Sequence, residues 1–152
     1  MPFLPRFLAL LVLTACASGG TAAAPSAAVA FAPALEVDTA AMRRLPSGLL
    51  VRDLDAGSGS AAARGREVTV HYTGWLPDGT RFDTSEGGQP VTFRLGAGTA
   101  IRGWEEGLVG LRPGGRRQLV VPARLAYGRR GLAGKVPPDA TLVFLIEMVG
   151  VR

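Results

Sequence analysis

Short segments in which apolar and polar residues alternate, separated by turn sequences, constrain this chain more than any other feature. A period of two places alternate side chains on one face of a β-strand. The clearest cases are residues 66–75 and 141–151, where the apolar faces consist of Val68, Val70 and Tyr72 and of Leu142, Phe144, Ile146 and Met148. The 21 glycines and 11 prolines supply many turns, and they argue against a helical bundle.

The rest of the chain from residue 35 on divides in the same way. Strands are predicted at 49–55, 80–84, 91–95 and 116–121, and the Leu-Pro-Asp-Gly turn at 76–79 joins two strands into a hairpin. Helical spacing of apolar residues predicts one helix over 101–109, ended by Gly110. A short helix over 35–45, ended by Pro46, and one helical turn within 122–127 are also expected. Hairpins with a single main helix predict an α+β domain, an antiparallel sheet curled over that helix.

The first residues have the pattern of a secretion signal rather than of a folded element. Arg6 precedes an apolar run over 7–13 that is too short to span a bilayer, and small residues lead to Cys16. Leu13-Thr14-Ala15-Cys16 resembles the lipobox of bacterial lipoproteins, whose cysteine carries lipid after the signal is removed. The alternative is an ordinary signal with an incidental cysteine. We therefore expect a signal peptide over 1–15 and a lipidated Cys16 opening a flexible Ala-rich tether over 16–34.

A pre-domain segment over 35–46 and one domain over 47–152 complete the predicted organisation. The 17 Lys and Arg residues exceed the 12 Asp and Glu, but they are scattered, so we expect a solvated basic surface and no nucleic-acid binding. A single cysteine and a single histidine, His71, exclude an internal disulfide and make a zinc-ligand cluster very improbable. Glu105 and Glu106 are interpreted as a solvated helix face, and His71 as a polar-face or hydrogen-bonded strand residue.

The sequence does not match the phosphate-loop motif, the dinucleotide-binding fingerprint or the motif of a serine triad, so neither a cofactor nor a metal is expected. Instead, ordered blocks of the sequence closely resemble the FKBP-type peptidyl-prolyl cis-trans isomerases across about residues 47–151. The blocks are VHYTG at 70–74, DGTRFDTS at 78–85, IRGWEEG at 101–107, AYG at 126–128 and PPDATLVF at 137–144.

The resemblance implies a five- to six-stranded antiparallel sheet curled around one short helix, with a ligand pocket between them. Each aromatic residue alone is more readily explained as core packing, and the joint match favours a pocket. The resemblance gives catalytic positions at Asp83, Tyr127, Trp104, Phe82 and Tyr72, and substrate-binding positions at Phe93, Ile101, Val136 and Phe144. Trp104 would form the pocket floor, whereas Trp75 has no place in the family pocket.

The implied activity is rotation of X–Pro bonds without covalent chemistry, by desolvating and twisting the amide in an aromatic pocket. The expected partners are proline-containing exported polypeptides, macrolides of the kind the family binds, and a membrane through the lipid on Cys16. A pocket that binds proline segments without turnover and a structural lipoprotein are the alternatives. A monomer is the default. Ala17 lacks the Asp associated with inner-membrane retention, which favours the outer membrane facing the periplasm.

Several positions depart from the family pattern around the pocket. Lys135 stands where an apolar residue is common, and Leu132 where His or a polar residue is common. Ala100 and Val91 are smaller than the usual Val and aromatic residue. We therefore expect a wider pocket with a more basic rim, and tolerance of or preference for acidic residues beside the substrate proline.

Overall fold

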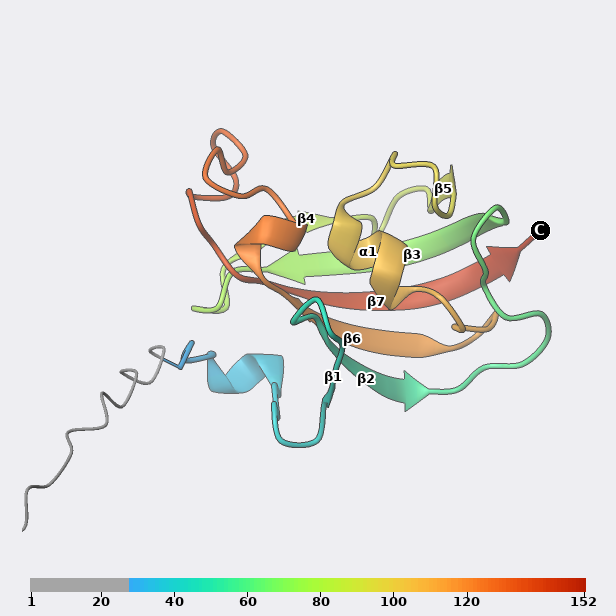
Figure 1. Cartoon of the computed structure of the whole chain (residues 1–152), viewed down its shortest axis with the longest axis horizontal. Helices are drawn as coiled ribbons and strands as arrows, with labels where there is room; N and C mark the ends of the chain where they lie inside the picture. Colours follow the sequence, from blue (N-terminus) through green and yellow to red (C-terminus); the bar gives the residue numbers. More distant parts are fainter. Residues whose placement is uncertain (1–27) are drawn as a thin grey trace, which may run out of the picture.

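A computed structural model describes residues 28–152; Cys16 and the predicted signal peptide lie outside this range. The chain forms one sheet and one short α-helix, α1, which lies across a face of the sheet (Figure 1). The elements in chain order are η1 Pro33–Leu35, β1 Arg43–Arg44, β2 Leu50–Asp55, β3 Glu67–Trp75, β4 Arg81–Thr84, β5 Val91–Arg94, α1 Arg102–Gly107, β6 Arg116–Val121, η2 Ala123–Leu125 and β7 Leu142–Val151. No helix in this part of the chain is long and apolar enough to span a bilayer.

All strand pairs are antiparallel, and the order across the sheet is β1-β2-β6-β7-β3-β4, with β5 also paired to β3. Strands β4 and β5 share one edge of β3, since β5 pairs with Glu67–Val70 and β4 with Thr73–Trp75. Seven strands therefore fill six positions. The predicted antiparallel sheet around one short helix is confirmed, and each of the strands predicted at 49–55, 66–75, 80–84, 91–95, 116–121 and 141–151 is present within one or two residues.

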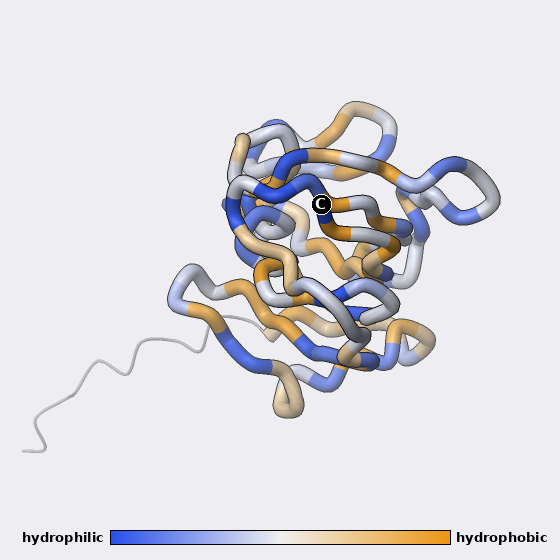
Figure 2. The backbone as a smooth tube through the Cα atoms, turned by 90° about the vertical axis from the view of Figure 1, so that its right-hand side faces the viewer, coloured by the Kyte–Doolittle hydropathy of each residue, from blue (hydrophilic) through white to orange (hydrophobic). Residues whose placement is uncertain are grey.

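Helix α1 packs on β6 at the concave face of the sheet. A side chain at Gly103 would meet Val121 Cγ1 at 2.4 Å, and one at Gly107 would meet Leu119 Cδ1 at 2.8 Å. These two glycines therefore allow the helix to approach the strand closely. The helix is shorter than the predicted 101–109, because Ile101 is extended (φ −60°, ψ 150°) and serves as the N-cap. Apolar stretches of chain run through the interior, and hydrophilic ones lie mainly in peripheral loops (Figure 2).

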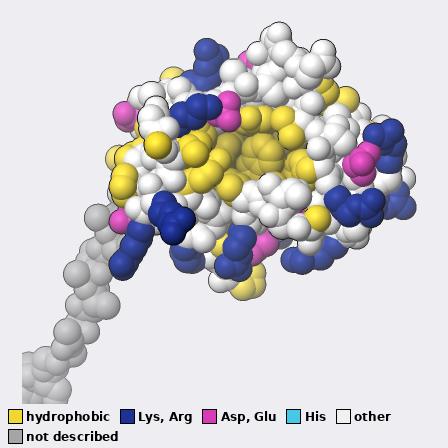
Figure 3. Space-filling model, turned by 90° about the horizontal axis from the view of Figure 1, so that it is seen from above, with side chains coloured by type: hydrophobic (Ala, Val, Ile, Leu, Met, Phe, Trp, Pro, Cys, Tyr) yellow, Lys and Arg dark blue, Asp and Glu magenta, His cyan; other side chains and the backbone are white. Residues whose placement is uncertain are grey.

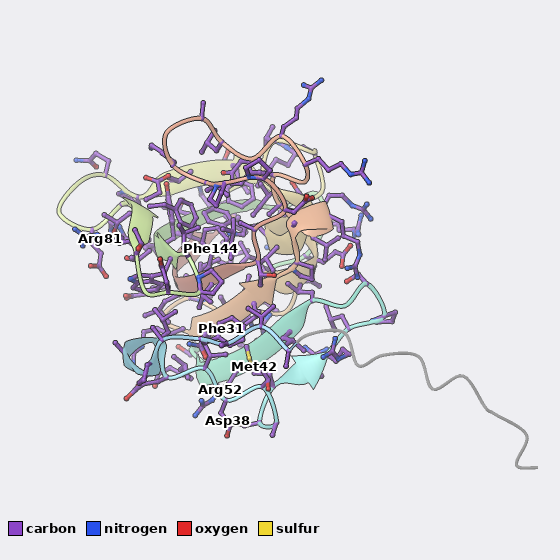
Figure 4. All side chains as sticks on the ribbon, turned by 90° about the vertical axis from the view of Figure 1, so that its left-hand side faces the viewer. Phe31, Asp38, Met42, Arg52, Arg81 and Phe144 are labelled. Carbon is purple, nitrogen blue, oxygen red and sulfur yellow. The ribbon has the colours of Figure 1, made fainter. Side chains whose placement is uncertain are left out.

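The back face of the sheet carries a second apolar cluster, which the N-terminal segment covers. Its buried members are Leu35, Met42, Leu50, Val120 and Val143, with Phe31, Ala32, Val37 and Trp75 packed around them. Gln118 Nε2 donates a hydrogen bond to the Leu35 carbonyl (2.8 Å), and the Ala32 N–H donates to the Pro77 carbonyl (2.7 Å). Phe31 and Met42 thus lie on the opposite side of the sheet from Phe144 (Figure 4).

The helix predicted over 35–45 is wrong. Glu36 adopts a left-handed conformation with φ of 49°, and the Asp38 carboxylate accepts the Ala40 N–H at 3.0 Å. Both features belong to turns and compete with helical hydrogen bonds. The segment instead follows the back face and ends as β1, paired with β2.

One arginine departs from the expected solvated basic surface. Arg117 is only 5% exposed, pairs with Asp53, and donates from Nη1 to the carbonyls of Gly107 (2.7 Å) and Val109 (2.9 Å). Free carbonyls at a helix C-terminus attract cations. Arg117 therefore satisfies the end of α1 and ties the helix to β6.

Candidate active site

An aromatic hollow of about 310 Å³ opens beside α1 on the concave face. In the space-filling view it is the continuous apolar depression at the centre of the surface (Figure 3). The lining residues are Tyr72, Phe82, Asp83, Val91, Phe93, Thr99, Ala100, Ile101, Trp104, Tyr127 and Phe144. They come from β3, β4, β5, α1, β7 and the loops beside them, so the hollow exists only in the folded sheet.

Trp104 organises the rings around the hollow. Its ring centroid lies 4.8 Å from that of Tyr72 and 5.4 Å from that of Phe144, both edge to face, and 6.0 Å from that of Phe93. Phe82 in turn meets Phe144 edge to face at 5.6 Å. Such edge contacts are the preferred geometry of aromatic pairs and hold the rings in fixed orientations. The walls are therefore built from rings that pack against one another.

Gly74 makes room for two of these rings. A Cβ at this position of β3 would lie 2.7 Å from the Phe82 ring and 2.8 Å from the Phe144 ring. The glycine in the VHYTG block is thus explained by close approach of aromatic side chains to the strand. Any larger residue would push the rings into the hollow.

The polar groups of the hollow centre on Asp83. Its Oδ2 accepts the Tyr72 hydroxyl at 2.8 Å, and its Oδ1 accepts the Thr84 N–H at 3.0 Å. Burial, followed by the hydrogen bond to Asp83, raises the pKa of Tyr72 from 10.0 to about 12. Burial and the Asp83 charge also raise the pKa of Tyr127. Both phenols therefore keep their protons as donors throughout the neutral range.

Two donors at the hollow lack partners among the described residues. The Tyr127 hydroxyl makes no hydrogen bond within residues 28–152. Trp104 Nε1 is buried and unpaired there as well. A free hydroxyl at the wall can donate to a ligand carbonyl, whereas the indole N–H of Trp104 is buried at the floor.

The structure brings together almost all of the residues to which the family resemblance assigned a site. Tyr72, Phe82, Asp83, Phe93, Ile101, Trp104, Tyr127 and Phe144 line the hollow. Val136 does not line it: its side chain is 5% exposed, belongs to the main core, and borders a separate depression under the 128–138 loop. Thr99 was missed, because a polar loop residue without a family motif gives no sequence signal.

Glu105 corrects an expectation. It was expected on a solvated helix face, yet it is 8% exposed, and its carboxylate accepts the Gly96 N–H. Gly96 opens the loop that carries Thr99 and Ala100 to the hollow. Glu105 therefore positions one wall of the site without touching it. Nothing in the sequence distinguishes the two adjacent glutamates, of which Glu105 is buried and Glu106 is partly exposed.

A second hollow of about 270 Å³, bordered by His71, Glu86, Arg116 and Glu147, lacks aromatic walls apart from its edge at Tyr72. His71 Nδ1 lies 3.0 Å from Ser85 Oγ, as expected of a hydrogen-bonded strand histidine. Within residues 28–152, no group of three His, Cys, Asp or Glu side chains is placed to hold a metal ion. The aromatic hollow, and not this mostly polar one, is therefore the better candidate for binding an apolar ligand.

A single antiparallel sheet over a short helix, with an aromatic hollow between them, defines a non-covalent binding site for an apolar group. The family described as FKBP-type peptidyl-prolyl cis-trans isomerase matches residues 58–149. The chain belongs to this family and is an FKBP-type peptidyl-prolyl cis-trans isomerase.

Proteins with similar sequences support the same family assignment. The FK506-binding protein of Neisseria meningitidis serogroup B is 49% identical over 105 residues, covering 68% of this chain and 96% of its own. The FK506-binding protein of Streptomyces anulatus is 45% identical over 109 residues, covering 70% of this chain and 88% of its own.

Solved structures give the same fold. The crystal structure of FkpA from Escherichia coli superposes with a TM-score of 0.68 at 40% identity, over 74% of this chain and 52% of that one. The chain thus spans about half the length of FkpA. AtFKBP13 superposes with a TM-score of 0.66 at 39% identity, over 73% of this chain and 98% of its own.

Proposed function

We propose that this isomerase accelerates X–Pro rotation in exported polypeptides, using the aromatic hollow to bind the proline ring and the amide before it. The observation that carries the proposal is the ring set around Trp104, which offers an apolar aromatic surface of the right kind for a pyrrolidine. A pocket of this volume with few polar groups matches a small apolar ligand held in one orientation.

The reaction needs no covalent step. An X–Pro bond rotates slowly because resonance gives the C–N bond partial double-bond character, with a barrier of about 18–20 kcal/mol. Twisting the bond removes the resonance and the charge separation between oxygen and nitrogen. Water stabilises the planar, more polar form, and an aromatic hollow that excludes water removes this preference. The site then binds the twisted amide better than the planar one, which is what lowers the barrier.

We assign the polar roles to Tyr127 and Asp83. The free Tyr127 hydroxyl donates a hydrogen bond to a substrate carbonyl and so fixes the orientation of the bound amide. Asp83 holds the Tyr72 ring against Trp104 through the Tyr72 hydroxyl and presents a carboxylate to the substrate backbone. Phe82, Phe93, Ile101 and Phe144 supply apolar wall. Val136 supports the loop beside the site from the core.

The direct test is the cis-to-trans rate of short X–Pro peptides with and without the purified protein. We expect acceleration above the thermal rate and inhibition by FK506, since curated relatives carry the name FK506-binding protein. Because both ligands would occupy the same hollow, Trp104→Ala should abolish both effects. Peptide rates equal to the thermal rate would refute the proposed function.

We further propose that Cys16 is lipidated and holds the protein on a bacterial membrane, the outer membrane facing the periplasm. The support is the short apolar run ending in Leu-Thr-Ala-Cys, and Ala17 after it. A multiply acylated cysteine would be needed, because one acyl chain gives only marginal membrane binding. Cys16→Ala should move the protein from the membrane to the soluble fraction. Ser18→Ala, close by, serves as control, and unchanged fractionation of the cysteine variant would refute the anchor.

A further inference from the structure

The only lysine of the chain, Lys135, lies at the edge of the aromatic hollow. Its Nζ is 3.9 Å from Asp83 Oδ1, and the two side chains are 51% and 35% exposed. Lys135 itself borders a separate shallow depression under the 128–138 loop, together with Arg130. The ion pair therefore joins the hollow to a neighbouring surface that carries two cations.

The backbone holds Lys135 in place. Leu132 and Val136 exchange hydrogen bonds, each 2.8 Å long, across a small bridge, and the Lys135 N–H donates to the Leu132 carbonyl at 2.9 Å. Val136, the next residue, is anchored in the main core. The loop backbone at Lys135 is therefore tied down by these contacts, and the side chain extends from it toward Asp83.

Asp83 makes no direct hydrogen bond to the Lys135 ammonium group, whose Nζ stays available for another acceptor. Both carboxylate oxygens already accept hydrogen bonds, from the Tyr72 hydroxyl and from the Thr84 N–H, and the 3.9 Å contact with Lys135 is too long for another. Half-exposed ion pairs of this kind contribute little stability. A second carboxylate can thus take the ammonium group at small cost, while Asp83 keeps its other partners.

We propose that Lys135, with Arg130 beside it, forms a subsite for a carboxylate next to the substrate proline, so that acidic-flanked X–Pro segments are the preferred substrates. This inference rests on the proposed function for the place of the proline in the hollow. The substrate carboxylate pairs with Lys135 at the hollow edge, and the Arg130 charge adds attraction from the same depression. Lys135 is a specificity residue and takes no part in the bond rotation.

The test compares three peptides in each of two series, with Glu, Ala or Lys placed immediately before or immediately after the proline. We expect the Glu peptide of at least one series to exceed its Lys counterpart in kcat/KM by about two- to five-fold at low salt. The preference should disappear in 1 M salt, where screening acts within about 3 Å. Lys135→Met should remove the preference, and Lys135→Glu should reverse it.

Arg129→Met is the matched control, because Arg129 is an exposed cation of the same loop that borders neither depression. It removes one charge and should leave the Glu-to-Lys ratio unchanged. Equal ratios in the wild type for both series, a preference that survives 1 M salt, or an equal loss of preference in Arg129→Met would each overturn the inference.

Binding of the same peptides, followed by tryptophan fluorescence, separates this inference from the proposed function. Charge-selective binding without any acceleration would refute the proposed isomerisation and support the Lys135 subsite. Acceleration of all peptides alike would support the isomerisation and refute the subsite.

Discussion

The two faces of the sheet are both apolar, yet only one of them is left open. On the back face, residues 31–44 cover Leu50, Val120 and Val143. On the concave face, the six-residue helix α1 packs closely on β6 and leaves the part over β3, β4 and β5 to aromatic side chains. The concave face keeps an open site because helix α1 is too short to cover it, whereas the back face becomes core because the N-terminal segment covers it.

Trp104→Ala should have the largest effect, because Trp104 belongs to both the site and the main core. We expect a loss of about 3–5 kcal/mol in the free energy of unfolding and loss of peptide isomerisation. Urea denaturation and peptide kinetics on the same samples give both values. Trp104→Phe, which keeps a ring, should restore part of each; a Trp104→Ala protein with wild-type stability would contradict the core role.

Met42→Ala tests the closed face. Met42 belongs to the N-terminal segment, packs into the back-face cluster and is only 8% exposed, so truncation should cost about 2 kcal/mol of stability. The rate per folded molecule should stay at the wild-type value, since the sheet separates Met42 from the hollow. Met42→Leu, of similar volume, is the control for stability. A matching fall in kcat/KM would mean that the two faces are not independent.

Period-two alternation is clearest at 66–75 and 141–151, and turn sequences on either side helped to bound the other strands. Strand β6 has both faces buried, because Leu119 belongs to the main core and Val120 to the back-face cluster, so alternation alone does not reveal it. The pattern failed at 35–45, where the segment lies against the back face of a sheet formed by distant residues, and no local period reports that. Glu105 and Arg117 escaped for a related reason: their burial depends on the Gly96 N–H and on the carbonyls at the end of α1. The site itself came from family blocks, and Val136 shows that a matched position can support a pocket from the core without lining it.

Tyr127→Phe tests the open face with little change in the core. Removing this hydroxyl, which has no partner within residues 28–152, should lower kcat/KM roughly five-fold, or about 1 kcal/mol of transition-state stabilisation, and leave stability nearly unchanged. Peptide kinetics and urea denaturation measure the two effects. Tyr72→Phe is the comparison, since its hydroxyl is already used within the protein by Asp83. Wild-type kinetics for Tyr127→Phe would remove its proposed role.

Alkaline pH tests the polar centre of the open face through the Tyr72 phenol. The pKa of the Tyr72 phenol is raised from 10.0 to about 12 in the folded protein, so the phenol is protonated in both the folded and the unfolded chain below pH 10. Between pH 10 and 12 the unfolded chain releases this proton and the folded protein keeps it, so this contribution to stability is lost as pH rises. Thermal unfolding across this range should show a steeper decline for the wild type than for Tyr72→Phe. Identical declines would show that Tyr72 is not perturbed.

The two edges of the sheet determine whether an extended peptide could pair with the backbone of this protein. One edge is β1, only two residues long and made of Arg43 and Arg44; the other is shared by β4 and β5, four residues each, which carry Arg81 and Arg94. Short, charged edges are poor templates for adding another strand. The sheet of this isomerase is therefore protected at both edges from pairing with an extended prolyl peptide.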